Sequence, residues 1–258
     1  MHVIVLGAGS SAGTPVIGCR CDTCTSDDPR NRRSRCSAAV VLPAGEVLLI
    51  DTGPDLRQQA LRESLQRVDA VLYTHTHADH LHGIDDLRSF CQLGRRQIPL
   101  YGSPEHISTI TDRFGYTLRA PGHHWDLPVL GAHAVSEPFE LFGVKITPVP
   151  ARHGRSGVYG YRIGDMAWLT DISEIPPSSL ALLQGLEVLF LDCLRLRSHP
   201  THVNLEQSLS YAGQIGAGVT HLIHMTHEFE YGALAAQLPR GVRVGYDGLR
   251  VDFSMTVE

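Results

Sequence analysis

The chain contains a single lysine, Lys145, among 258 residues, and its other basic residues are arginines. Its formal net charge is −5, so it lacks the strong basic excess that is typical of general nucleic-acid-binding proteins. No apolar stretch approaches the roughly 18 residues needed to span a bilayer, which argues against a membrane-spanning helix. Pro-, Gly- or Ser-rich linkers and internal repeats are also lacking, so nothing in the sequence marks a boundary between domains.

The beginning of the chain, MHVIVLG, has no basic region before its apolar run, and we expect a strand there instead of a signal peptide. Three of the six cysteines are crowded into CRCDTC, a spacing that suits a metal better than disulfide bridges. A reducing, cytoplasmic location fits both observations. With 43% apolar residues, the length suffices for one large α/β domain that covers residues 1–258.

Short runs rich in Val, Ile and Leu recur along the chain and end in polar turns, which is typical of buried strands. Between these runs the sequence predicts helices, and mixed strands and helices indicate the α/β class. The expected helices cover residues 55–66, 83–93, 104–114, 178–184 and 204–215, and residues 139–146 are expected to form a hairpin. Polar residues at strand ends can converge on one cleft, and here they are Asp51, His75, Asp171, Asp192 and His224.

Residues 73–83, YTHTHADHLHG, place four histidines and one aspartate within eight positions. His75 and His77 are two residues apart, so their side chains can point the same way and bind one metal ion. Asp79 and His80 must diverge from that pair and can bind a second ion. We expect Gly83 to let the backbone pass another segment closely.

One loop cannot complete two coordination shells, because each ion needs about four to six ligands. Three further candidates lie at other strand ends: His153 in VPARHG, Asp171 in LTDIS and His224 in LIHMTH. A carboxylate can bridge two ions, so Asp171 would join the pair. Taken singly, each of these residues could instead be an ordinary loop histidine or an aspartate that caps a helix.

Together, THTHADH, ARHG, LTD and IHMTH, with DTG upstream, resemble the motifs of the metallo-β-lactamase superfamily over nearly the whole chain. The resemblance implies an αββα sandwich with a dinuclear metal site at one edge. It also implies a ligand set: His75, His77 and His153 for the first metal, Asp79, His80 and His224 for the second, Asp171 as the bridge, and Asp51 orienting the loop. Redox members carry a glutamate at the position of His77, and lactam-cleaving members often lack the bridging aspartate. These differences favour hydrolysis of phosphate or other esters.

The segment GCRCDTC supplies three thiolates, from Cys19, Cys21 and Cys24, and a closed structural zinc site needs one more ligand. His227 lies three residues past His224 and is the expected fourth ligand, which would hold a zinc-binding loop at about 18–37. The alternative is three free buried cysteines. The basic run RNRRSR, residues 30–35, is expected to be either a solvated connector or a phosphate-facing loop.

The stretches GTP…GCRCDTC, RRSRCS and HMTHEF are similar to the PhnP subfamily. Its enzymes hydrolyse phosphoribosyl cyclic phosphate during phosphonate breakdown and also cleave cyclic nucleotides. The related PqqB proteins carry a similar cysteine cluster. The resemblance implies that His202, in HPTHVNLEQS, assists catalysis, with His199 as the alternative.

These observations predict a metal-dependent phosphodiesterase with two catalytic divalent metals, Zn or Mn, and one structural Zn. A hydroxide shared by the two metals would attack a small cyclic phosphodiester, either 5-phosphoribose 1,2-cyclic phosphate or a related cyclic nucleotide. Asp79 and His202 are the expected catalytic residues. The alternatives are a tRNase-type nuclease, a thioester or lactone hydrolase, and a non-catalytic PqqB-like accessory or carrier protein. Neither membrane nor nucleic acid is an expected partner, and a homodimer is left open.

Overall fold

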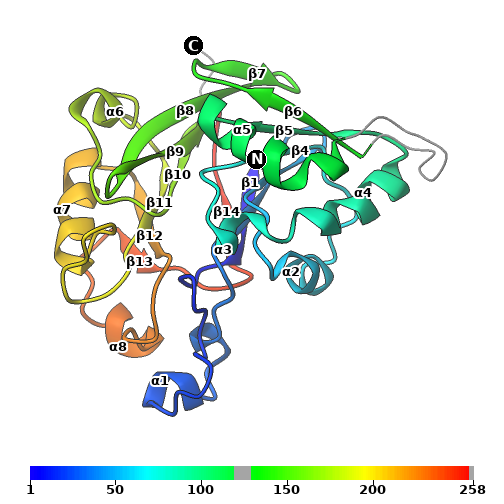
Figure 1. Cartoon of the computed structure of the whole chain (residues 1–258). Helices are drawn as coiled ribbons and strands as arrows, with labels where there is room; N and C mark the ends of the chain where they lie inside the picture. The colour runs from blue at the N-terminus through cyan, green and yellow to red at the C-terminus, as the bar shows by residue number, and fades with distance from the viewer. Residues whose placement is uncertain (119–128, 256–258) are drawn as a thin grey trace.

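Two seven-stranded sheets lie face to face, and helices cover the outer face of each (Figure 1). The structure is a computed structural model that describes residues 1–118 and 129–255. Helices α2 (Leu56–Arg62), α4 (Leu87–Gly94) and α5 (Pro104–Phe114) pack on the first sheet, and α6 (Pro177–Ala181) and α7 (Leu205–Ile215) pack on the second. This arrangement confirms the αββα sandwich expected from the sequence motifs.

The first sheet has the order β14-β1-β2-β3-β4-β5-β6. Its first half is antiparallel, whereas β3, β4, β5 and β6 run parallel to one another. The strands are β1 (His2–Gly7), β2 (Ser37–Val41), β3 (Val47–Ile50), β4 (Ala70–Leu72), β5 (Ile98–Gly102), β6 (Leu130–Ala134) and β14 (Arg250–Asp252).

The second sheet has the order β13-β12-β11-β10-β9-β8-β7, with β10 to β13 parallel and the remaining pairs antiparallel. Parallel strands end at the same edge of a sheet, so each sheet gathers several carboxyl-terminal strand ends together. The strands are β7 (Phe139–Leu141), β8 (Val144–His153), β9 (Ser156–Ile163), β10 (Met166–Leu169), β11 (Val188–Asp192), β12 (Val219–Ile223) and β13 (Val242–Val244).

Five helices match the expected ones and differ from them mainly at their ends, whereas the short helices α1, α3 and α8 were not predicted. Helix α7 begins where Asn204 and Gln207 form a capping box and ends at Gly216, whose φ is 66°. None of the helices in the described residues is long and apolar enough to cross a membrane. The helices are α1 (Asp22–Thr25), α2 (Leu56–Arg62), α3 (Ala78–Leu81), α4 (Leu87–Gly94), α5 (Pro104–Phe114), α6 (Pro177–Ala181), α7 (Leu205–Ile215) and α8 (Tyr231–Ala235).

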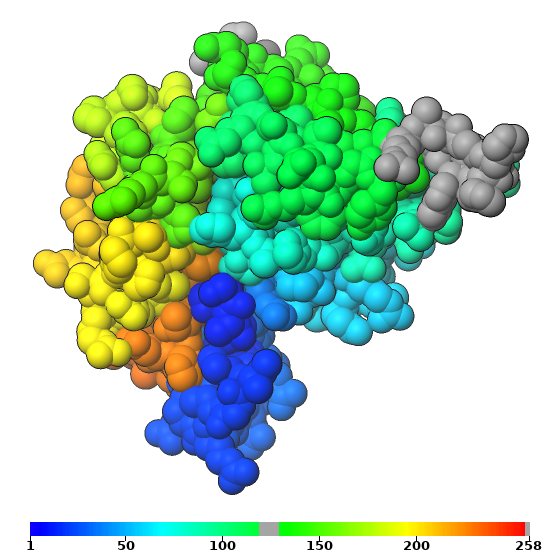
Figure 2. All heavy atoms as spheres, viewed as in Figure 1, coloured from blue at the N-terminus to red at the C-terminus, as the bar shows by residue number. Residues whose placement is uncertain are grey.

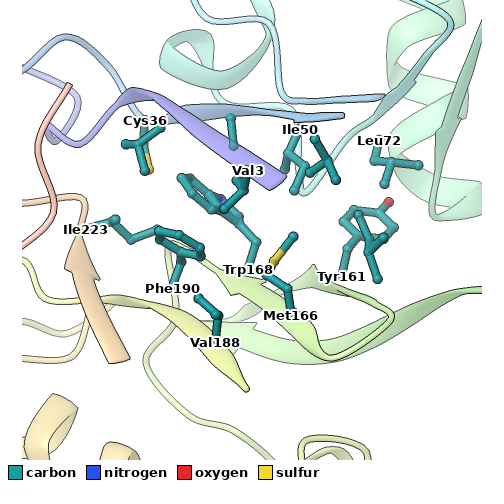
Figure 3. Packing of buried hydrophobic residues seen from close by; sticks show 14 of the residues in the cluster. Val3, Cys36, Ile50, Leu72, Tyr161, Met166, Trp168, Val188, Phe190 and Ile223 are labelled. Carbon is teal, nitrogen blue, oxygen red and sulfur yellow. The ribbon is translucent and has the colours of Figure 1, made fainter. Parts of the chain in front are cut away.

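Strand residues alternate between two cores, which explains why the strands are apolar on both faces. On β10, Met166 and Trp168 face the other sheet, whereas Ala167 and Leu169 face the outer helices. The side chains between the sheets interlock, and the rings of Trp168 and Phe190 lie 5.0 Å apart (Figure 3). This packed interior fixes how the two sheets sit and therefore how their strand ends meet.

Candidate metal centre

Three polar residues leave their strands in the left-handed backbone conformation. Asp51 follows β3 with a φ of 63°, Asp171 follows β10 with 56°, and His224 follows β12 with 58°. This conformation is uncommon for residues other than glycine and costs on the order of 1 kcal/mol. The abrupt turns hold these side chains at the edge where the parallel strands end, so the backbone itself builds the site.

The first group of candidate ligands consists of His75, His77, His153 and Asp171, whose ligand atoms all lie within 4.8 Å of one another. The Nδ1 atom of His153 donates to the carbonyl oxygen of Thr201 at 2.7 Å. Its other ring nitrogen, Nε2, is therefore left with a lone pair. The group combines three imidazoles with one carboxylate oxygen, a donor set that suits zinc and related divalent metals.

The tautomer of His75 follows from its neighbour Thr74. The single hydroxyl hydrogen of Thr74 is donated to Asp51 Oδ2 at 2.7 Å, so Thr74 Oγ1 must accept from Nδ1 of His75 at 3.0 Å. Nε2 of His75 consequently carries the lone pair. This nitrogen lies 3.8 Å from Asp171 Oδ1, inside the first group.

The second group consists of Asp79, His80, Asp171 and His224, again with all ligand atoms within 4.8 Å. Nε2 of His80 lies 3.1 Å from Asp171 Oδ2 and 3.3 Å from Asp79 Oδ2. Nε2 of His224 lies 3.4 Å from Asp171 Oδ2. Helix α3 starts right after His77 and carries Asp79 and His80, so the chain turns between the two pairs as the spacing predicts.

Asp171 belongs to both groups and turns one oxygen toward each. Its Oδ1 lies near His75, whereas its Oδ2 lies near His80 and His224. Oδ2 also accepts a hydrogen bond from Thr170 Oγ1 at 2.6 Å, which fixes the carboxylate. This orientation is the one that a carboxylate bridging two cations requires.

Two fully buried carboxylates, Asp51 and Asp192, lie next to the Nδ1 atoms of histidines whose Nε2 atoms face the candidate metal centre. Asp51 accepts from the Thr74 amide at 2.8 Å and from His80 Nδ1 at 2.7 Å. Asp192 accepts from His202 Nδ1 at 3.0 Å, and its other oxygen lies 3.5 Å from His224 Nδ1. Carboxylates in such positions fix the tautomer and orientation of metal-binding histidines.

The sequence analysis names Asp192 only as a polar residue at a strand end. Its partners lie ten and thirty-two residues further along the chain, and no local pattern joins them. The position at the end of β11, between β10 and β12, was the one available signal.

Of the two histidines considered for catalysis, His202 lies at the centre. Its Nε2 is 3.9 Å from Asp171 Oδ1, and its ring stacks on that of His224 with centroids 5.0 Å apart. His199 lies on the outer side, with its ring 5.2 Å from that of His202 and its Nδ1 bonded to Thr201. The geometry therefore favours His202.

Several buried ring nitrogens of this cluster lack a hydrogen-bond partner among the described residues. They are Nε2 of His75, of His80 and of His224, together with Nδ1 of His224. An unpaired buried polar atom costs about 1–3 kcal/mol, so three Nε2 atoms at one place indicate a missing binding partner. Divalent cations take such imidazole nitrogens together with carboxylate oxygens, and the donors present here fit them.

The charges of the cluster respond to one another. Burial opposes ionisation of Asp171, but His224, His80 and His75 outweigh it and hold its pKa well below the usual range. Burial also disfavours the charged form of His224, but Asp171 and Asp192 outweigh it and raise its pKa to about 10. Asp171 is therefore ionised, and its charge favours a protonated His224, which would release that proton when a divalent cation binds.

The predicted cysteine site is assembled at the lower end of the molecule, near α1 (Figure 1). Nδ1 of His227 lies 3.3 Å from the sulfur of Cys19 and 3.4 Å from those of Cys21 and Cys24. Tetrahedral zinc with the usual bond lengths places sulfur and nitrogen ligands about 3.6 Å apart. The amide of Cys24 lowers the pKa of Cys21 to about 6, and burial raises that of Cys24 to about 11. The four side chains fit a closed zinc site.

The basic run at residues 30–35 is solvated only in part, because Arg30 and Arg32 are exposed whereas Arg33 and Arg35 are not. Arg33 is 1% exposed and donates to the carbonyl oxygens of Thr226 and Phe229, at 3.2 and 2.6 Å. Arg35 pairs with Asp55 at 2.7 Å. These arginines tie the N-terminal loop to α2 and to the segment after β12, so their role is structural.

Two glycines allow the histidine loop to lie against the turn after β3. A Cβ atom added to Gly53 would overlap the carbonyl oxygen of Asp79, and one added to Gly83 would overlap the carbonyl oxygen of Gly53. The close passage expected at Gly83 is therefore confirmed. It holds Asp79 and His80 at a fixed distance from Asp51.

The fold and the paired ligand groups define a class, the hydrolases with the metallo-β-lactamase fold. A family model described as "Beta-lactamase superfamily domain" matches residues 47–225. The structure superposes on a crystal structure of a diphosphatase from the PhnP family with a TM-score of 0.92 and 41% identity, covering 100% of this chain and 99% of that one. The chain belongs to the β-lactamase superfamily and, within it, to the PhnP family.

Two further relatives share less of their length. An octanoyltransferase of Porphyromonas gingivalis is 38% identical over 256 residues, which is 96% of this chain and 51% of that protein. A coenzyme PQQ synthesis protein B of Methylobacterium radiotolerans is 31% identical over 165 residues, which is 59% of this chain and 53% of that protein. The chain thus spans about half the length of these two relatives.

Proposed function

We propose that the protein is a metal-dependent hydrolase of phosphoric diesters and that its substrate is a small cyclic phosphodiester such as 5-phosphoribose 1,2-cyclic phosphate. The observation that carries this proposal is Asp171, which turns one oxygen toward each of two ligand groups. Two divalent cations, Zn or Mn, would be held there, with His75, His77 and His153 on one and Asp79, His80 and His224 on the other.

An anionic substrate fits the loop that leads to His202. Residues 193–203, CLRLRSHPTHV, contain two arginines and two histidines and no acidic residue. Arg197 is largely exposed and lies 3.5 Å from Glu228, and Arg195 donates to the carbonyl oxygens of Arg197 and Ser198. Positive charge beside a metal-binding site attracts phosphate groups and raises their rate of encounter.

The residues around the cations divide the chemistry between them. Bound divalent metals would lower the pKa of water and neutralise charge on the phosphoryl oxygens. Asp192 accepts from His202 Nδ1 and thereby directs Nε2 toward the centre, where it would donate a proton to the departing sugar oxygen. Asp51 accepts a hydrogen bond from Nδ1 of His80 and keeps this ring in the tautomer that exposes Nε2, whereas Nδ1 of His224 lies 3.5 Å from Asp192.

A second candidate activity is hydrolysis of a diphosphate. It is favoured by the 41% identity over the full length to the PhnP-family diphosphatase. The same ligands and the same proton donor would serve, because a phosphoanhydride also releases an oxygen leaving group, in that case the oxygen of a phosphate instead of a sugar. The octanoyltransferase relative supports acyl-transfer chemistry less well, because half of that protein has no counterpart in this chain.

Turnover by the metal-reconstituted full chain tests the proposal. We would compare 5-phosphoribose 1,2-cyclic phosphate, bis(p-nitrophenyl) phosphate, ADP-ribose and an acyl thioester with Zn or with Mn. The cyclic phosphate should give the highest kcat/KM. Faster cleavage of ADP-ribose would favour the diphosphatase alternative, and turnover of the thioester alone would contradict both.

His202→Ala checks the proton donor. It should lower kcat about 10²- to 10⁴-fold while the metal content stays unchanged. His82→Ala is the matched control, because His82 is exposed and lies beside Phe114, outside both ligand groups. An unchanged kcat in His202→Ala would remove His202 from the mechanism.

A further inference from the structure

A separate cavity of about 260 Å³ lies between β12, β13 and α8, outside both metal-binding clusters. His221, in the middle of β12, lines it and is 3% exposed. Neither ring nitrogen of His221 has a hydrogen-bond partner among the described residues. Leaving a buried donor and acceptor unpaired is costly, so a polar group is expected to meet this ring inside the cavity.

The rest of the lining combines aromatic and aliphatic side chains with the charged side chain of Arg243. Tyr231 and Tyr246 meet edge to face with ring centroids 5.8 Å apart, and Leu238 and Leu249 add apolar surface. His221 itself stacks on Phe190, with centroids 5.2 Å apart, so its ring plane is fixed.

We propose that this cavity binds a small aromatic ring that carries a hydroxyl group. The hydroxyl pairs with a ring nitrogen of His221, and the ring packs against the tyrosines and leucines. Burial lowers the pKa of His221 to about 4, so the imidazole is neutral at pH 7 and suits an uncharged partner. A cavity of about 150 Å³ already accommodates benzene in an engineered protein, so the space is sufficient for one substituted ring.

Two residues that line the cavity are close in sequence to one candidate ligand of each predicted metal site. His221 is three residues before His224 on the same segment, and Tyr231 is four residues after His227. A ligand here would therefore stabilise the segment that carries a ligand of each site. The proposal does not depend on the catalytic activity, because its test measures binding.

Phenol is the probe, titrated into the full metal-loaded chain labelled with ¹⁵N in its histidine rings. One imidazole should shift in a saturable manner, and that signal should be missing in His221→Phe. Toluene, which lacks the hydroxyl, should bind about five- to tenfold more weakly. Equal affinities would remove His221 from recognition, and absence of phenol binding would show that the cavity holds water alone.

A second pair of variants guards against misfolding of His221→Phe. Ala235 is an exposed residue of α8 that lines the cavity, whereas the neighbouring exposed Ala236 does not. Ala235→Phe should abolish phenol binding and Ala236→Phe should preserve it, with unchanged metal content in both. Phenol binding retained in Ala235→Phe would overturn the proposal.

Discussion

At the scale of single residues, the site depends on carboxylates that no metal would touch. Asp51 is fully buried and accepts hydrogen bonds from the amide and hydroxyl of Thr74 and from His80. Through Thr74 it also fixes His75. One side chain therefore orients a candidate ligand of each metal.

Asp51→Asn should weaken metal binding about 10- to 100-fold, because an amide cannot accept from both Thr74 and His80 as a carboxylate does. The measurement is titration of the metal-free protein with Zn or Mn under competition from a chelator. Asp252→Asn, an exposed change on β14, is the control. Equal affinities in the wild type and in Asp51→Asn would show that this carboxylate does not orient the ligands.

Asp69 has a structural role, and its ionisation makes the stability of the fold depend on pH. It accepts from the Val47 amide at 2.7 Å and from Arg67 at 2.7 and 2.8 Å. Burial alone would raise its pKa, but these partners and Arg96 lower it below the ordinary value. A lowered folded-state pKa contributes stability that is full above the unfolded value of about 3.9 and is lost as the pH falls through the folded value.

Asp69→Asn should therefore lower the free energy of unfolding by about 1–3 kcal/mol at pH 7. The difference from the wild type should shrink as the pH falls below about 4. Urea unfolding at several pH values measures it. A difference that is the same at pH 7 and at pH 3 would mean that the ionised carboxylate contributes nothing.

At the scale of elements, the N-terminal loop is built as an attachment to the segment after β12. The cysteines meet His227, Arg33 donates to Thr226 and Phe229, and Asn31 bonds Glu230 at 2.7 Å. In Figure 2 the N-terminal loop, in dark blue, lies at the bottom of the molecule, where the yellow and orange part meets the light-blue part. Zinc bound by the three cysteines and His227 would fasten the N-terminal loop to the segment after β12.

Cys21→Ser should reduce the zinc content by one ion per chain and make residues 11–35 more sensitive to protease. Metal analysis and limited proteolysis provide the two readouts. Cys91→Ser is the control, because Cys91 is buried and bonds Val129 outside every candidate metal group. An unchanged zinc count in Cys21→Ser would defeat the assignment of this site.

Sequence patterns predicted elements best where the apolar signal is strong and local. The hairpin at 139–146 is confirmed, with Phe142 and Gly143 at φ values of 52° and 75° in its turn. The helix expected over 83–93 begins instead with a 3₁₀ turn, Ile84–Asp86, because the backbone must first pass Gly53 closely. Strands β5, β6, β9, β13 and β14 were not predicted. A proline in β5 and glycines in β9 weaken the strand signal of these two.

At the scale of the whole molecule, the candidate centre joins two sheets. His75, His77, Asp79 and His80 follow β4 of the first sheet, whereas His153, Asp171 and His224 come from the second. The motifs predicted this set of side chains because each stands beside a strand end. They could not predict that Asp192 serves His202 and His224 together, since that depends on the order of β10, β11 and β12.

Removal of metal should destabilise the entire sandwich, because cations at this seam bind the folded chain and not the unfolded one. At metal concentrations 1,000-fold above Kd the effect is about 4 kcal/mol, or on the order of 10 °C in Tm. Calorimetry before and after chelation measures it, and re-addition of Zn or Mn should restore Tm. Asp171→Ala should respond less to the chelator than the wild type. An unaffected wild-type Tm would contradict metal binding at the seam.

The left-handed turns at Asp51, Asp171 and His224 carry a consequence for evolution and engineering. Glycine would relax the backbone at each of these positions, yet each such change would delete a donor atom or its support. Selection for stability alone would therefore favour glycine at these positions, and the side chains that build the site would be lost. At these three positions the chain keeps a strained backbone conformation together with the side-chain atoms that build the site.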